Sequence, residues 1–415
     1  MSEEQTTHKP QRIFYAAGPG NVISAHGHWL RGAYEPTEVS ITFSSQIQDY
    51  CRATNSPACI VSYRSPPEHL KDGLFILEHR PKSMPGARGL KFHIAEALYA
   101  CSLFGTAVKF KSTVAILDSG SSHFFMGWLF RLARIPVITV LHNTIWPSGF
   151  PPTRLIPKLI QRLDALFFRW GSSATIGVSP ECVRQVDQLT KGHHGPLYEI
   201  RAQFLPERFE AIAPPPRFDG SSLRIMFIGR VDRIKGVFDI LEMAKRLEEK
   251  FPGRIHWEIC GTGPDFKLLA QKRGEMALDN VDLLGWVSME KLQEVYGRSH
   301  LSIVPTRSDF AEGLAMTAAE AILAGRPLIT NPTVPALELL RPASLEGRTN
   351  DVDSYVEVIG RLVENPSNYT SLCAACAPLR AQFYDRSRGL TAVLSSVLAS
   401  KFRSGEAVPH SSRTD

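Results

Sequence analysis

The stretch PTRSDFAEGLAMTAAEAILAGRPLITN, from Pro305 to Asn331, decides how the chain is interpreted. Glu312 stands just before small residues that begin a helix, Glu320 follows eight positions later, and Ala-Gly-Arg-Pro leads into an apolar strand. A helix N-terminus offers unpaired N–H groups and a positive dipole end, so it suits a phosphate. Small residues let a ligand approach the backbone. We therefore expect this segment to hold a phosphorylated ligand that carries several hydroxyl groups.

The composition indicates a soluble globular protein with more than one domain. A chain of 415 residues is too long for one ordinary core, and roughly 150 residues per domain favours two domains here. With 43% apolar and 21% charged residues, the chain is neither disordered nor fibrous. The formal charge of +6 favours anionic ligands or an anionic membrane surface.

The cysteines and the apolar segments indicate a cytoplasmic protein. Seven cysteines, an odd number in apolar contexts, argue against a disulfide framework and for a reducing compartment. Cys373 and Cys376 form a single C-x-x-C, which we interpret as buried small side chains on a helix. The first ten residues lack the apolar core of a signal peptide. The most apolar region, 124–141, is interrupted by arginines and a proline, so no membrane span is expected.

Apolar segments alternate with segments of helical spacing along the whole chain. Such alternation predicts mainly parallel sheets covered by helices on both faces. The pattern lapses between 191 and 219, and three consecutive prolines place a connector near 214–220. The fold class predicted is α/β, with two tandem Rossmann-like doubly wound domains facing a cleft. The expected strands are 12–17, 58–62, 74–78, 113–117, 136–141, 174–178, 224–228, 255–260, 281–284 and 301–304.

The domain limits follow from these elements. A first domain is expected over 11–215 and a second over 221–380, while 384–402 forms a helix that packs back on the first domain. Polar tails, expected to be disordered, occupy 1–10 and 403–415. Ligands of doubly wound sheets bind beyond the carboxyl ends of the strands, which points to the cleft between the two domains.

Four elements of the second half fall at such strand ends. The loop GRVDRIKG places Arg230 and Lys235 before a helix, where two cations suit a diphosphate. Gly261 and Gly263 belong to a turn where backbone can approach a ligand, and a flat base could lie near Trp286-Val287. The opening stretch, with its two acids, is the fourth element.

Taken together, these elements resemble glycosyltransferase family 4, the retaining nucleotide-sugar transferases of GT-B fold. The matching motifs are GRVDRIKG, CGTGP, LLGWV, IVPT and EGLAMTAAEAILAGRPLI, all within 224–330. The family usually has an aromatic residue and a glycine after Glu-Gly, where this chain has Leu314 and Ala315. It often has paired glycines after the first strand, where Pro19 separates Gly18 from Gly20 here.

The resemblance implies a role for each matching residue of the second half. Arg230 and Lys235 would neutralise the donor diphosphate, Glu312 would lie at the donor sugar and Glu320 would bind the ribose hydroxyls. Backbone N–H groups would meet the sugar and phosphates. The residues that supply them are Leu314, Ala315 and Met316.

The first half supplies a histidine and a loop. His142, at the end of a strand and followed by Asn143, resembles the family's histidine near the donor sugar, and His26, His28 and His123 are rival candidates. The turn with Gly18, Gly20 and Asn21 is either part of a donor and acceptor loop or a plain turn.

The segment Pro151 to Trp170 places Arg154, Lys158 and Arg162 on one face of an amphipathic helix. Such a helix either lies on an anionic bilayer, where lipid-linked acceptors are found, or covers a sheet with a solvated cationic side.

The function expected is transfer of a sugar, with retained configuration, from a nucleotide-diphosphate donor to an acceptor hydroxyl in cell-surface polysaccharide or glycolipid synthesis. The acceptor, a carbohydrate or a lipid-linked sugar, is assigned to the first domain, and a place at the inner face of the membrane follows. A sugar-nucleotide epimerase and a non-catalytic sugar-nucleotide-binding protein remain alternatives. We expect no cofactor, no metal and no nucleic-acid partner, and the sequence does not predict the oligomeric state.

Overall fold

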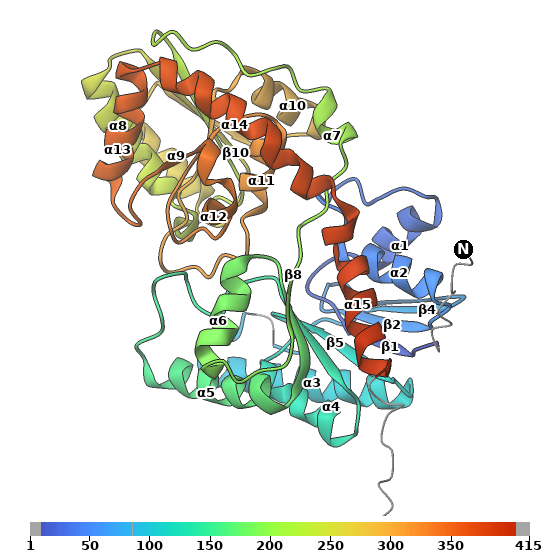
Figure 1. Ribbon diagram of the computed structural model, residues 1–415. Helices are drawn as coiled ribbons and strands as arrows, with labels where there is room; N and C mark the ends of the chain where they lie inside the picture. Colours follow the sequence, from blue (N-terminus) through green and yellow to red (C-terminus); the bar gives the residue numbers. More distant parts are fainter. Residues whose placement is uncertain (1–9, 85, 404–415) are drawn as a thin grey trace, which may run out of the picture.

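Two α/β domains, joined by an extended connector, form the computed structural model, which describes residues 10–84 and 86–403 (Figure 1). The tails expected at 1–10 and 403–415 lie outside these ranges apart from Pro10 and Arg403. The predicted fold class is confirmed, since both domains are built on a largely parallel sheet with helices on both faces.

The first domain is organised around an eight-stranded sheet of order β3-β4-β2-β1-β5-β6-β7-β8. Its central strands are buried along their whole length, as expected for apolar runs in a parallel sheet covered on both faces. All its neighbouring strands run parallel except the β3–β4 pair. The strands are β1 (Ile13–Ala16), β2 (Ala58–Ser62), β3 (Glu68–Asp72), β4 (Phe75–His79), β5 (Val114–Asp118), β6 (Val137–Leu141), β7 (Ser172–Gly177) and β8 (Leu197–Glu199).

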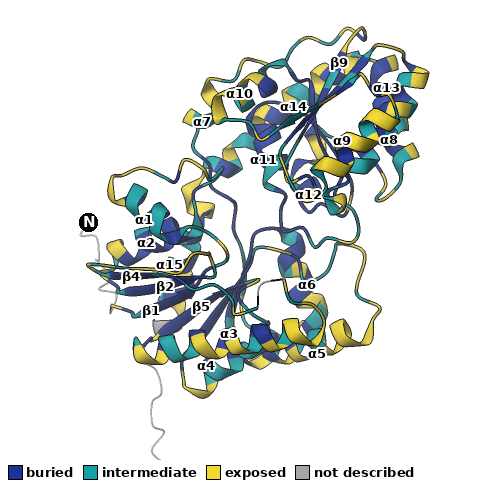
Figure 2. Ribbon diagram, turned by 180° about the vertical axis from the view of Figure 1, so that it is seen from behind, coloured by how far each residue is buried: buried dark blue, intermediate teal, exposed yellow. Residues whose placement is uncertain are grey.

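Two cores lie on the two faces of this sheet. On one face, helices α1 (Val22–Leu30), α2 (Phe43–Ala53) and α6 (Pro180–Thr190) pack around a core that includes Trp29, Ile47 and Val186. On the other face, α3 (Leu90–Lys109), α4 (Trp128–Leu132) and α5 (Leu155–Trp170) contribute Leu103, Phe130 and Phe167 to a second core. Both figures show α3, α4 and α5 along the lower edge of the first domain (Figures 1 and 2).

The second domain repeats the architecture with a six-stranded parallel sheet of order β11-β10-β9-β12-β13-β14. Its strands are β9 (Leu223–Ile228), β10 (Ile255–Cys260), β11 (Val281–Gly285), β12 (Leu301–Val304), β13 (Leu328–Thr330) and β14 (Ser344–Glu346). Its helices are α8 (Val237–Lys250), α9 (Phe266–Glu275), α10 (Met289–Arg298), α11 (Met316–Leu323), α12 (Ala336–Leu340), α13 (Val352–Glu364) and α14 (Ser367–Tyr384).

The chain returns to the first domain at its end. Helix α15 (Leu390–Arg403) lies beside α2 (Figure 1). The backbone N–H of Leu390 donates to Gln46 Oε1 at 2.8 Å, and Thr391 Oγ1 donates to the Gln46 carbonyl at 2.8 Å. The connector is anchored in turn by Arg326, a fully buried guanidinium of the second domain that donates to the Ala213 carbonyl at 2.8 Å. The C-terminal helix and the anchored connector therefore both link the two domains outside the cleft.

Some short elements were not predicted from the sequence. Strand β3 is polar and largely exposed, so it lacks an apolar pattern, and β8 and β14 have three residues each. The segment between 191 and 219, where the pattern lapses, contains β8 and the one-turn helix α7 (Glu207–Glu210). In the part of the chain that the structure describes, no helix combines the length and the apolar character that crossing a membrane requires.

Candidate active site

A cleft of about 520 Å³ lies between the two domains, beyond the carboxyl ends of β1, β5 and β6. This interdomain cleft brings together predicted site residues from both halves of the chain. From the first domain come His142 and the turn with Gly18, Gly20 and Asn21, and from the second come Glu312, Leu314, Ala315 and Met316. A Cβ added to Gly18 or Gly20 would meet no atom within 4 Å, so both glycines border open space.

Asp118 is a buried carboxylate in this cleft that sequence reasoning missed. Its Oδ2 accepts a hydrogen bond from the Tyr15 hydroxyl at 2.5 Å and lies 2.8 Å from His142 Nε2. The distance between Asp118 Oδ2 and His142 Nε2 is that of an ion pair, but the two groups are not aligned for a hydrogen bond. Burial and the Asp118 carboxylate together raise the pKa of Tyr15 well above its ordinary value. Asp118 ends an apolar strand next to β6 in the sheet, which is the signal that could have identified it.

Glu312 is held by two donors of its own domain. Its Oε2 accepts from Lys235 Nζ at 2.6 Å and from Thr306 Oγ1 at 3.1 Å, and the residue is only 7% exposed. Lys235 lies in the loop after β9, and its ammonium also lies 4.2 Å from the ring centroid of Phe310. The predicted cation and the predicted acid are therefore in direct contact at the edge of the interdomain cleft.

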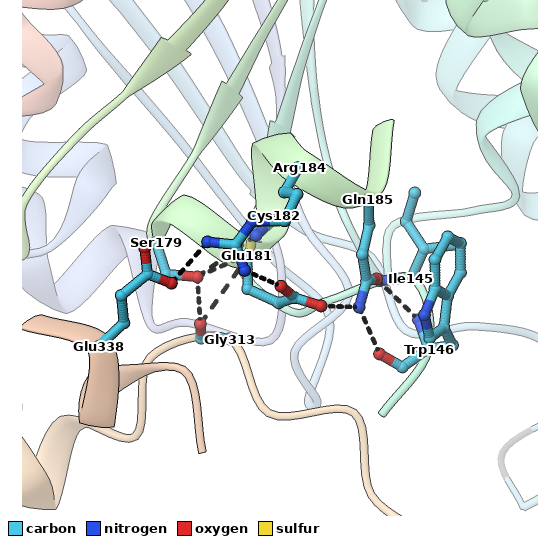
Figure 3. A network of polar contacts seen from close by, with 9 residues as sticks. All are labelled: Ile145, Trp146, Ser179, Glu181, Cys182, Arg184, Gln185, Gly313 and Glu338. Carbon is cyan, nitrogen blue, oxygen red and sulfur yellow. Dashed lines mark hydrogen bonds and ion pairs between the residues drawn. The ribbon is translucent and has the colours of Figure 1, made fainter. Parts of the chain in front are cut away.

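Gly313 marks the point where the two domains touch. A Cβ at this position would lie 1.7 Å from the His142 carbonyl oxygen, so a larger residue would force the domains apart. The Ser179 hydroxyl donates to the Gly313 carbonyl at 2.7 Å (Figure 3). In the same network, Arg184 of α6 binds Glu181 at 2.6 Å and reaches across to Glu338 at 2.5 Å. This close approach is what brings His142 and Glu312 to the same cleft.

The start of α11 faces the interdomain cleft with an unusual backbone. Ala315 has φ 69°, in the left-handed region that favours glycine, and both Leu314 and Ala315 are buried. The first N–H groups of a helix have no partner within that helix and are free to meet a ligand. The arrangement can therefore bind a phosphate between the α11 start and Lys235.

Comparison with known proteins matches part of the chain to a family. Residues 209–382 match the model described as glycosyl transferases group 1. This stretch is a glycosyl transferases group 1 domain. No curated protein sequence matches the chain. The whole chain is also similar to solved structures of low sequence identity, which show its GT-B fold.

Three of these structures cover nearly all of the chain. The α,α-trehalose 6-phosphate synthase of Burkholderia multivorans has 12% identity and a TM-score of 0.71, covering 98% of this chain and 100% of its own. The sucrose-phosphate synthase of Thermosynechococcus elongatus has 13% identity and a TM-score of 0.68, covering 95% and 100%. HepE of Anabaena, solved in complex with UDP, has 13% identity and a TM-score of 0.62, covering 95% and 100%.

Other predicted residues of the glycosyltransferase lie outside the interdomain cleft. Arg230 is exposed and pairs with Asp232 at 2.9 Å. A Cβ at Gly261 would lie 1.9 Å from the Gly229 carbonyl oxygen, and a Cβ at Gly263 would lie 2.2 Å from the Val231 carbonyl oxygen. Close packing between the two loops therefore already requires both glycines. Trp286 is 76% exposed, and Val287 packs against the cluster around Tyr296.

Glu320 borders a small cavity of its own and does not line the interdomain cleft. It is 4% exposed, and Arg208 and Tyr296 line the same cavity of about 10 Å³. Burial raises the pKa of Glu320 to about 7, and the nearby Arg208 opposes this effect. Among the described residues no hydrogen bond reaches its carboxylate. Arg208 donates to the Glu35 carbonyl at 3.0 Å, so the connector links this corner to the first domain.

The rival histidines of the glycosyltransferase have other partners. His26 is buried between Gln48 and Asp72, and His28 lies beside Arg31 on α1. His123 stacks on Phe125 and borders a different cleft. Within residues 10–84 and 86–403, no group of three or more His, Cys, Asp or Glu is arranged to hold a metal ion.

Proposed function

We propose that this glycosyltransferase moves a sugar from a nucleotide-diphosphate donor to an acceptor hydroxyl with retention of the anomeric configuration. The observation that carries the proposal is the meeting of two half-sites across one cleft. Glu312, Lys235 and the α11 start come from one domain. Asp118 and His142 come from the other.

The leaving group explains the cationic half-site. A nucleoside diphosphate gains negative charge as it leaves, and fixed donors aimed at that charge stabilise the transition state. Lys235 and the N–H groups of Leu314, Ala315 and Met316 would meet this charge, and Arg230 would turn from Asp232 to join them. Glu312 would then exchange Lys235 for the hydroxyls of the donor sugar.

The remaining predicted residues take the other parts of the donor. Glu320 would accept hydrogen bonds from the ribose hydroxyls, which supply the partner that its buried carboxylate lacks. Trp286 and Val287 would lie against the base, and Gly261 and Gly263 would hold the neighbouring turn. HepE in complex with UDP, and with UDP and glucose, supports a nucleotide sugar as the donor.

The first domain would supply the reaction centre and the acceptor. His142, oriented by Asp118, would lie at the donor sugar. The turn with Gly18, Gly20 and Asn21 would border the sugar and the acceptor, a carbohydrate or a lipid-linked sugar. Contact between the domains at Gly313 would exclude water that otherwise hydrolyses the donor. No metal or other cofactor takes part in this proposal.

We further propose that the acceptor belongs to cell-surface polysaccharide or glycolipid synthesis, with the glycosyltransferase at the inner face of the membrane. The support is the outward side of α5, where Leu155 is 84% and Leu159 is 57% exposed beside the exposed Lys158. A sheet-covering helix with a merely solvated outer side would not present such side chains.

A thermal-shift screen tests the donor assignment. Nucleotide sugars and free nucleotides with different bases are each added to the full chain, because a ligand that binds the folded state raises its melting temperature. We expect one base to stabilise the protein, with loss of the effect in Arg230→Ala and Glu312→Ala. Failure of every nucleotide and nucleotide sugar to raise the melting temperature would overturn the proposal.

A further inference from the structure

A second cleft, of about 590 Å³, opens next to the interdomain cleft on the first domain. This side cleft is bordered by the start of α3, the loops 119–125 and 143–152, α5, and residues 310–311 of the second domain. It shares Ser119, Gly120 and Asn143 with the interdomain cleft. Because residues 310–311 directly precede Glu312, a molecule in the side cleft lies beside the proposed reaction centre.

The inner end of the side cleft is polar. His93 Nδ1 lies 3.0 Å from His123 Nε2, and the hydroxyl-bearing Ser122 borders the same end. Close by, Lys82 Nζ pairs with the Glu96 carboxylate at 2.7 Å and donates to the Gly120 carbonyl at 2.8 Å. Asp164 also lines the cleft, with Oδ1 accepting from the Phe125 N–H at 2.9 Å, and burial raises its pKa to about 7. Burial and the neighbouring His93 and Lys82 lower the pKa of His123 to about 4, so this imidazole is neutral. A neutral imidazole N–H at this end can donate to an oxygen of a phosphate group.

The outer end of the side cleft is apolar and continues onto the protein surface. Phe92 and Phe150 are 42% and 44% exposed at its rim, and Ile156 of α5 is 62% exposed. Beyond the rim, Leu155 of α5 and Leu90 of α3 are 84% and 75% exposed. Helices α3, α4 and α5 lie together along one edge of the domain (Figure 2), and the starts of α3 and α5 both border the side cleft. A soluble sugar would gain little from such walls, whereas a hydrocarbon chain would be buried by them.

The sequence span that carries this face has an excess of cations. Residues 80–171 contain twelve Lys and Arg against three Asp and Glu, while the whole chain has a net charge of +6. The three acids, Glu96, Asp118 and Asp164, are all buried. The cations Lys91 and Lys158 are exposed among the apolar side chains, on α3 and α5 respectively. Exposed cations without exposed acids are attracted to an anionic bilayer.

We propose that the side cleft is the acceptor site and that its occupant is a membrane lipid with a phosphate-bearing head. The head lies at the His93 and His123 end, and the chain leaves past Phe92 and Phe150 to an anionic bilayer against α3 and α5. This inference rests on the proposed sugar transfer, since it names the acceptor of that reaction.

One wall of the side cleft is held by contacts that reach the second domain. Gln185 Oε1 accepts from the Trp146 N–H at 3.1 Å, and Gln185 Nε2 donates to Glu181 at 2.8 Å (Figure 3). Glu181 binds Arg184, which binds Glu338 of the second domain. The wall formed by Trp146 is therefore connected to the second domain through this chain of contacts, in the same arrangement that brings Glu312 and His142 into one cleft.

Binding to vesicles tests the membrane face. The full chain is mixed with vesicles of phosphatidylcholine alone or with a third of phosphatidylglycerol, and bound protein is measured after sedimentation. We expect binding to the anionic vesicles only, with at least a tenfold loss in Lys158→Glu and Leu159→Ser. Lys267→Glu and Leu268→Ser, on exposed positions of α9, should bind as the original chain does. Equal binding of all four variants, or no binding to anionic vesicles, would overturn the proposal.

Titration with dodecyl phosphate tests the cleft itself. We expect its affinity to exceed that of inorganic phosphate and of dodecanol at least tenfold, and to fall at least tenfold in His123→Ala and in Phe150→Ser. Equal affinities for dodecyl phosphate and inorganic phosphate, or no change in either variant, would contradict a lipid acceptor. Nucleotide stabilisation of the same variants is measured in parallel. If it persists while lipid binding is absent, the lipid proposal fails and the donor assignment stands.

Discussion

Burial of Glu320 makes the stability of the glycosyltransferase depend on pH in a calculable way. Its folded-state pKa is raised from 4.5 to about 7, so between these values the folded state keeps a proton that the unfolded state has lost. Stability therefore falls as the pH rises through this window. At 1.36 kcal/mol per pKa unit, the loss amounts to about 3 kcal/mol. Because glutamine cannot ionise, the free energy of unfolding of Glu320→Gln should not fall in this way.

The expected result is a difference between the two proteins that grows with pH. They should be similarly stable near pH 4.5, and Glu320→Gln should be the more stable above pH 7. A domain of 150–250 residues shifts by about 2–4 °C per kcal/mol, which predicts a melting temperature higher by roughly 6–12 °C. Glu275→Gln, at an exposed position of the same domain, serves as the control. Parallel melting curves for Glu320→Gln and the original chain from pH 4.5 to 8 would refute this account.

The proposed ribose contact adds a second measurement on the same residue. Ribose hydroxyls donate to a carboxylate and favour its charged form, so a bound nucleotide should lower the pKa of Glu320 and release a proton near pH 6.5. Titration calorimetry in two buffers of different ionisation enthalpy measures that proton. Because the nucleotide itself titrates, the comparison is again with Glu320→Gln. The same proton release in both proteins would show that ribose does not meet this carboxylate.

Three further substitutions test the geometry of the interdomain cleft. Gly313→Ala places a methyl group against the His142 carbonyl oxygen. The transfer rate should fall by about 10²-fold, while nucleotides still raise the melting temperature. An unchanged rate would show that contact between the domains at this point is not needed. Ala315→Gly relieves a left-handed backbone and should raise the free energy of unfolding in denaturant by roughly 1 kcal/mol, whereas a loss of stability would argue against strain there. Asp118→Asn replaces the carboxylate beside His142 by a neutral amide. It should lower kcat by roughly 10²-fold or more, with little change in donor affinity. A defect confined to KM would assign Asp118 to binding alone.

Local patterns predicted much of the fold because its central strands are apolar along their whole length. Buried strands such as β5 and β6 read as apolar runs, and the acid, small residues and helix from Glu312 onward are contiguous in sequence. Strand β3 was not predicted because it is polar and exposed, so nothing in its composition distinguishes it from a loop.

Contacts between distant segments could not be predicted in the same way. Asp118 meets Tyr15 only through the register of β1 beside β5, and a sequence pattern carries no register. Gly261 illustrates a different limit. A glycine that lets a ligand approach and one that lets another backbone approach look identical in sequence, and here Gly229 occupies that space. The approach of His142 to Gly313 depends on how the two domains meet, which no single segment encodes.

The most direct test of the central claim is acceptor-dependent turnover of the donor. The full chain is incubated with the nucleotide sugar that stabilises it, with and without lipid extract, and release of nucleoside diphosphate and labelling of the lipid are measured together. We expect equal amounts of both products with lipid, little release without it, and loss of both in Glu312→Ala. Conversion of the donor to another nucleotide sugar without any acceptor would contradict the proposed transfer, as would tight donor binding with no turnover under any acceptor condition.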